Sequence, residues 1–156
     1  MDLEERYPEK MVPIEKSGRM IENGSRVFVG TGCGEPQALV RTMVENKHVQ
    51  DIVVYQMLSY TFSNYVNDDF FLSRFSLKLF FISVYIRQAA FEGKIDYVPV
   101  YLSQIPEIFD SKEIGLDVAL IQVSPPDKFG FCSLGISVDI TLSGMRNARV
   151  VIAQVN

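Results

Sequence analysis

The stretch Arg26–Gln37 constrains the fold of this chain more than any other part of the sequence. Its first part, Arg26–Gly30, is a short apolar run rich in β-branched residues, which predicts a strand that is buried on both faces. Three glycines occur within five residues, at Gly30, Gly32 and Gly34. Glycine tolerates positive φ and leaves room for a ligand to touch the backbone.

A helix is expected directly after these glycines. Pro36 suits its first turn, because that position needs no N–H donor. We predict a helix from Pro36 to about Asn46, and its sheet-facing stripe is formed by Ala38, Leu39, Met43 and Val44. A strand, a glycine loop and a helix in this order present backbone N–H groups and a helix N-terminus to an anion or a carbonyl oxygen.

Similar short apolar runs predict further strands over Asp51–Leu58, Phe75–Ile82, Ile95–Leu102, Asp117–Val123 and Arg149–Val155. Helices are predicted over Ile14–Ile21, Tyr85–Glu92, Ser103–Phe109 and Asp139–Asn147. Residues 1–12 are expected to form an irregular arm, residues 59–69 a long loop with one helical turn, and residues 129–135 a short β excursion with Cys132 in the core. This alternation predicts an α/β fold, with a mostly parallel sheet and helices on both faces, as a single domain over residues 1–156.

Composition excludes several classes of function. The net charge is −4 and no basic block occurs, so a nucleic-acid surface is not expected. No apolar run reaches the roughly 18 residues of a membrane span, and the charged N-terminus lacks an apolar signal core. Cys33 and Cys132 show no CxxC spacing, which favours a reducing, cytoplasmic setting. His48 is the single histidine, so neither a histidine base nor a metal site is expected.

Small or hydrogen-bonding residues follow most of the predicted strands. Besides the glycine loop they include Ser59, Ser83, Ser103 and the segment Ser124–Asp127. In an open α/β sheet, ligands bind outside the carboxyl ends of the strands, so these positions form a candidate functional rim. Serine and proline also end strands for purely structural reasons, and composition alone does not separate the two interpretations.

The glycine loop matches neither common phosphate-binding motif. No Gly-Lys-Ser/Thr follows it, and the third glycine of a dinucleotide fingerprint is replaced by Glu35. A glutamate at the start of a helix would repel a phosphate, so a bound carbonyl or carboxylate fits better. Alternatively, Glu35 only stabilises the helix dipole, by about 0.3–1 kcal/mol. Cys33 could act as a nucleophile at a helix N-terminus, but without a neighbouring histidine it is better explained as a small filler.

Several segments resemble the acetyl-CoA hydrolase/transferase family, which includes the 4-hydroxybutyrate CoA-transferases. They are Val27–Gln37, Tyr97–Pro106, Ser124–Gly135 and Ala153–Asn156. Together these segments occur in the order of the family and are spread over most of the chain. The resemblance implies a NagB/RpiA/CoA-transferase-like fold. It also implies that the chain is the N-terminal half of a longer, two-domain enzyme.

The resemblance also implies a reaction. Members of the family move coenzyme A from an acyl-CoA to a carboxylic acid, or to water, through a glutamyl-CoA thioester. The catalytic glutamate lies in the C-terminal half, so no catalytic residue is assigned here, Glu35 included. Coenzyme A and acyl-CoA would be substrates and not permanently bound cofactors. A C-terminal half, acyl-CoA and a short carboxylic acid are the expected partners, in a homo-oligomer.

By the same resemblance, this chain would supply one wall of the substrate cleft. The residues expected there are Gly30, Thr31, Gly32, Cys33, Gly34, Glu35, Pro36, Gln37, Ser59, Tyr101, Ser103 and Gln104. Two alternatives stay open at this point. The enzyme could be an acyl-CoA hydrolase, in which water replaces the acceptor acid, or the chain could be a non-catalytic α/β module that binds a small acid or acyl thioester.

Overall fold

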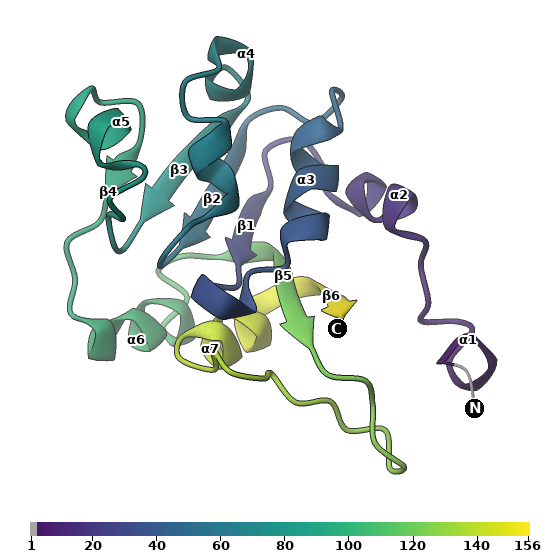
Figure 1. The fold of residues 1–156 in the computed structure, drawn as a ribbon. Coiled ribbons are helices and arrows are strands. Elements are labelled where there is room, and N and C mark those ends of the chain that lie inside the picture. The colour runs from purple at the N-terminus through teal and green to yellow at the C-terminus, as the bar shows by residue number, and fades with distance from the viewer. Residues whose placement is uncertain (1–2) are drawn as a thin grey trace.

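The fold is known from a computed structural model, which describes residues 3–156 (Figure 1). Six strands form one sheet in the order β4-β3-β2-β1-β5-β6. They are β1 Arg26–Val29, β2 Ile52–Gln56, β3 Phe75–Leu79, β4 Asp96–Tyr97, β5 Leu116–Val123 and β6 Ala148–Val155. Every neighbouring pair is parallel, so the predicted α/β class with a parallel sheet is confirmed.

Strand β1 lies at the point where the direction of the strand order reverses. It pairs with β2 on one side and with β5 on the other, so that Phe28 lies between Tyr55 and Ala119. From β1 the chain builds outward through β2, β3 and β4, and then crosses back to add β5 and β6. The carboxyl ends of β1 and β5 therefore flank the crevice where ligands bind in open parallel sheets.

The helices are mostly shorter than the sequence pattern predicts. They are α1 Leu3–Arg6, α2 Ile14–Ser17, α3 Gln37–Glu45, α4 Asp69–Leu72, α5 Arg87–Phe91, α6 Ile105–Asp110 and α7 Thr141–Asn147. Single 3₁₀ turns occur as η1 Gly18–Met20, η2 Gly32–Gly34, η3 Thr61–Asn64 and η4 Leu102–Gln104. The predicted loop at residues 59–69 thus contains η3 and the first residue of α4. No helix in the described part of the chain is long and apolar enough to cross a membrane.

One face of the sheet packs against α3, α4 and α5. Val27 and Val29 of β1 point to this face and are fully buried, as are Val40 and Met43 of α3. The predicted stripe of α3 is correct except for its first member, because Ala38 is only half-buried and Val40 contacts the sheet instead.

The opposite face packs against α6 and α7, which lie together on that side in Figure 1. The ring of Phe28 meets Phe109 of α6 edge to face, with ring centroids 5.6 Å apart. Gly144 of α7 lies against the same ring, and a Cβ atom at this position would stand 2.7 Å from its carbons. Glycine is therefore required here by close packing, although it weakens a helix.

Two predictions about strands are wrong. Strand β4 covers Asp96–Tyr97 only, because Pro99 cannot donate to a ladder and the pairing stops before it. Residues 129–135 form no strand, although Asp127 N–H donates to Phe131 O at 2.9 Å. Cys132 is exposed and does not belong to the core, because this hairpin-like loop extends away from the sheet.

Candidate functional site

The glycine loop follows β1 at the carboxyl edge of the sheet, and most of its amides are already used inside the protein. Two loop amides bond to other segments: Gly30 N–H donates to Leu120 O at 2.8 Å, and Gly32 N–H donates to Leu58 O at 3.2 Å. Two more bond within the loop: Gly34 N–H donates to Thr31 O at 2.9 Å, and Glu35 N–H donates to Gly32 O at 3.1 Å. The sequence suggests a row of free donors, but the structure leaves at most the N–H groups of Thr31 and Cys33. The loop therefore offers shape more than it offers hydrogen bonds.

Close packing explains why the loop is made of glycines. A Cβ atom on Gly30 would lie 2.8 Å from the carbonyl oxygen of Gly34, and Gly32 has a φ of +55°. A Cβ atom on Gly34 would lie 3.0 Å from Cβ of Ser137, which belongs to the segment between β5 and α7. The segments that follow β1 and β5 thus contact each other at the switch point of the sheet.

Glu35 occupies a position that the sequence did not reveal. Only 3% of it is exposed, and α3 begins two residues later, at Gln37. The predicted placement of Glu35 in the first turn of α3, where it would stabilise the helix dipole, is therefore wrong, because that turn holds no acidic residue. The carboxylate accepts hydrogen bonds from Tyr60 N–H at 2.9 Å, Thr61 N–H at 2.8 Å and Gln56 Nε2 at 3.1 Å. It lies at the start of η3 and joins the glycine loop to the segment that follows β2.

Thr31 and Ser59 are also buried. The hydroxyl of Thr31 accepts from Leu58 N–H at 2.8 Å and donates to Leu58 O at 3.2 Å. The Oγ atom of Ser59 accepts from Phe62 N–H at 3.2 Å at the start of η3. Both side chains are buried and form hydrogen bonds to nearby backbone groups. Their predicted contact with a substrate stays a prediction.

Cys33 and Gln37 are the exposed side chains of the loop region, whereas Pro36 is buried. The Oε1 atom of Gln37 accepts from Arg41 at 3.3 Å, one turn along α3. The two free cysteines, Cys33 and Cys132, are both exposed. Within residues 3–156 no cluster of His, Cys, Asp and Glu residues could hold a metal ion.

The turn after β4 contains the other predicted site residues, Tyr101, Ser103 and Gln104, all exposed. The N–H of Gln104 donates to Tyr101 O at 2.9 Å, and Tyr101 N–H donates to Gln104 Oε1 at 3.4 Å. Among the hydrogen bonds of the described residues, none joins this turn to the glycine loop. The structure therefore leaves the turn and the loop as separate elements.

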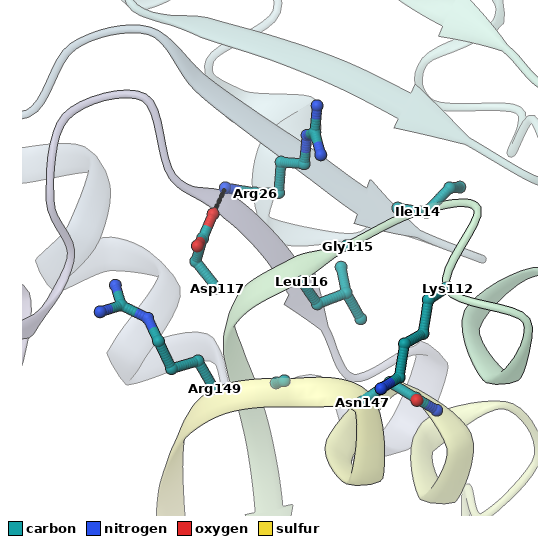
Figure 2. Close-up of a pocket in the computed structure, with 9 residues that line it drawn as sticks. Arg26, Lys112, Ile114, Gly115, Leu116, Asp117, Asn147 and Arg149 are labelled. Carbon is teal, nitrogen blue, oxygen red and sulfur yellow. Dashed lines mark hydrogen bonds between the residues drawn. The ribbon is translucent and has the colours of Figure 1, made fainter.

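A hollow of about 370 Å³ lies at the opposite, amino-terminal edge of the sheet (Figure 2). It is lined by Arg26, Lys112, Ile114, Gly115, Leu116, Asp117, Asn147, Ala148 and Arg149. Figure 2 shows that the side chains of Arg26, Lys112 and Arg149 point in different directions and share no common focus. None of the residues predicted for the site lines this hollow.

The clearly shifted pKa values also lie outside the glycine loop. Burial lowers the pKa of Arg74, whose guanidinium donates to the carbonyl oxygens of Val44 and Asn46, at 2.9 Å each. This arginine caps the end of α3 and has a structural role. On the surface, hydrogen bonds from Lys94 and Gln88 lower the pKa of Glu92.

Sequence reasoning missed the partners of Glu35, which are Gln56 and the two amides of Tyr60 and Thr61. One signal was available: Gln56 is the one amide side chain in the otherwise apolar run Ile52–Leu58. A polar group in a buried strand requires a buried partner. No comparable signal pointed to Ser137, because only its packing against the glycine loop distinguishes it.

Comparison with known proteins gives a clear family. The sequence profile of the acetyl-CoA hydrolase/transferase N-terminal domain matches residues 1–156. This chain belongs to the acetyl-CoA hydrolase/transferase family. The predicted resemblance is confirmed, and the family match covers the glycine loop together with the segments after β2, β4 and β5.

Relatives of this family member are CoA transferases. A 4-hydroxybutyrate coenzyme A transferase from Clostridium kluyveri is 38% identical over 157 residues, which cover 100% of this chain and 36% of that protein. A succinyl-CoA:acetate/propanoyl-CoA:succinate CoA transferase from Fasciola hepatica is 36% identical, covering 97% of this chain and 32% of that protein. The chain thus spans about a third of the length of these relatives.

Solved structures of similar proteins agree with the fold. The crystal structure of RipA from Yersinia pestis superposes with a TM-score of 0.86 at 28% identity, covering 100% of this chain and 38% of RipA. A 4-hydroxybutyrate CoA-transferase from Porphyromonas gingivalis gives a TM-score of 0.70 at 23% identity, covering 99% of this chain and 35% of that one. The second similarity shows the fold alone.

Proposed function

We propose that this chain is the N-terminal domain of a CoA-transferase. The enzyme would move coenzyme A between an acyl-CoA of the 4-hydroxybutyryl, butyryl or acetyl type and a carboxylate such as acetate (the EC 2.8.3 class). The observation that carries the proposal is the match of the whole chain to about a third of two CoA transferases, at 38% and 36% identity. A C-terminal half would complete the substrate cleft. The whole enzyme would form a homo-oligomer in the cytoplasm.

The geometry of Glu35 argues against it as the nucleophile of the reaction. A nucleophilic carboxylate must reach the thioester carbonyl. Glu35 is 3% exposed and both of its oxygens already accept hydrogen bonds, so it is not available for attack. As the family resemblance implies, we assign the glutamyl-CoA thioester to a glutamate of the C-terminal half, and the burial of Glu35 agrees with this assignment.

The part proposed for this chain is to shape the substrate side of the cleft. The glycine loop follows β1 beside β5, and a Cβ atom on Gly30 or Gly34 would crowd the loop itself or Ser137. The N–H groups of Thr31 and Cys33 are the loop amides left to stabilise negative charge on a thioester or carboxylate oxygen. Tyr101, Ser103 and Gln104 add polar atoms after β4.

The test compares the isolated chain with the protein encoded when the natural reading frame is followed past Asn156. Each is incubated with acetyl-CoA and isotopically labelled acetate, and exchange of label into acetyl-CoA is followed by mass spectrometry. We expect exchange by the longer protein and none by residues 1–156 alone. Exchange by the isolated chain, or a reading frame without a second half, would refute the proposal.

The same assay separates the two other functions. A hydrolase would release free coenzyme A in the absence of any carboxylate acceptor, at a rate that added acetate does not change. A binding module would show saturable affinity of the isolated chain for a small acid or an acyl thioester, without turnover in the longer protein.

A further inference from the structure

We propose that Glu35 is a positioning residue for the transfer reaction, because its buried carboxylate fixes the segment after β2 against the glycine loop. The inference rests on the proposed function, since it assigns a role within the same cleft. Glu35 itself would not touch the substrate. It would instead fix the backbone of Tyr60, a residue that is 41% exposed.

Three donors share the single carboxylate of Glu35, and we call this set of hydrogen bonds the tether. Thr61 N–H donates to one oxygen at 2.8 Å, while Tyr60 N–H and Gln56 Nε2 donate to the other at 2.9 Å and 3.1 Å. The partners lie 21 to 26 residues away along the chain. Hydrogen bonds to an ionised acceptor are stronger than those between neutral groups. A single side chain thus joins two segments that approach the cleft from neighbouring strands.

Gln56 adds a second hydrogen bond between β2 and the glycine loop. Its Nε2 atom donates to Gly30 O at 2.9 Å as well as to Glu35, so it contacts both ends of the glycine loop. These two acceptors fix the orientation of the amide, since both require the NH₂ group. The Oε1 atom of Gln56 has no partner among the described residues. The role of Gln56 is therefore that of a donor.

The arrangement requires a carboxylate in particular. A glutamine at position 35 has nearly the same shape, but one of its two terminal atoms becomes an NH₂ group. That group would face the N–H of Thr61 on one side, or the N–H of Tyr60 and Nε2 of Gln56 on the other. Donors facing donors cannot pair, so at least one link is lost and a buried donor remains unsatisfied.

The first measurement tests the tether in residues 1–156. Amide hydrogen exchange at Tyr60 and Thr61 is compared between the unsubstituted chain and Glu35→Gln. We expect the protection of at least one of these two amides to fall by about tenfold or more, the factor carried by one hydrogen bond to a charged group. Glu45→Gln, which removes an exposed glutamate of α3, is the matched control and should leave both amides unchanged. Equal protection in Glu35→Gln would overturn the inference.

The second measurement tests positioning in the longer protein of the exchange assay. Glu35→Gln should raise KM for the carboxylate by about tenfold, while kcat per folded molecule changes by less than about threefold. A purely structural role would lower the folded fraction and leave KM unchanged, and that result would overturn the inference. If Glu35→Gln fails to fold, Gln56→Met removes the Nε2 donor together with the unpartnered Oε1, and a rise in KM in the same direction is expected. An unchanged KM in this variant would overturn the inference as well.

The two proposals fail in distinguishable ways. If the unsubstituted longer protein exchanges label and its glutamine variant has the same KM, the positioning role is wrong and the proposed function stands. If the unsubstituted protein exchanges no label, the proposed function is wrong and the positioning role is overturned with it, whatever the exchange rates of the two amides show about the tether.

Discussion

Replacing Gly30 by alanine tests how tightly the glycine loop is closed. A Cβ atom at this position would lie 2.8 Å from the carbonyl oxygen of Gly34 and 3.6 Å from that of Leu120. The φ of Gly30 is not positive, so the cost comes from this contact and not from a strained backbone. The loop cannot simply move aside, because Gly30 N–H donates to Leu120 O at 2.8 Å and Gly30 O accepts from Gln56 at 2.9 Å.

Overfilling a packed site by one methyl group costs about 1–3 kcal/mol. Since the obstacle is a backbone oxygen that is held by the fold, we expect a loss near the middle of this range, about 2 kcal/mol. For a chain of 156 residues this corresponds to a fall in Tm of roughly 4–8 °C. Urea unfolding followed by circular dichroism measures it, and the m-value should not change.

Gly18→Ala is the matched control. Gly18 has a helical φ of −61°, and a Cβ atom there would meet its nearest neighbours at an ordinary 3.4 Å. Alanine at this position should be neutral or stabilise by up to about 1 kcal/mol, through the unfolded chain. Equal stability of the Gly30→Ala and Gly18→Ala variants would refute the argument that the contact with Gly34 closes the loop.

Two further substitutions test the packing that carries the site. Gly144→Ala would bring a Cβ atom to 2.7 Å from the ring of Phe28. After the gain in helix propensity is subtracted, we expect urea unfolding to show a net loss of about 1–2 kcal/mol in the free energy of unfolding. Unchanged stability would contradict the close contact of α7 and β1. Arg74→Met keeps the apolar stem but leaves the carbonyl groups of Val44 and Asn46 without their donors at 2.9 Å, so a loss of about 2–3 kcal/mol is expected. A thermal midpoint within about 2 °C of the unsubstituted chain would argue against this cap.

The sequence alone determined the fold class, because the signals for strands and for the glycine loop are local. Residues 27–29 are fully buried as their composition predicts, and all five neighbouring strand pairs are parallel. Element ends were predicted less well. Pro99 ended β4 early, and the aromatic residues at 129–131 suggested a strand where a projecting loop lies. Apolar content alone does not show whether a segment packs on the sheet or extends away from it.

Only the tertiary structure decided what Glu35 does. From its neighbours in sequence Glu35 looked like an acid in the first turn of a helix, but its partners, Tyr60 and Thr61, lie 25 and 26 residues further along. Hydrogen bonds over such distances depend on which strands become neighbours, and no local pattern encodes that. The same holds for the loop amides, because their acceptors in β5 and after β2 are fixed by the order of the strands in the sheet. The sequence could therefore propose residues for the candidate site, and their role stays a prediction, whereas the tertiary structure decided which of them are buried and which are exposed.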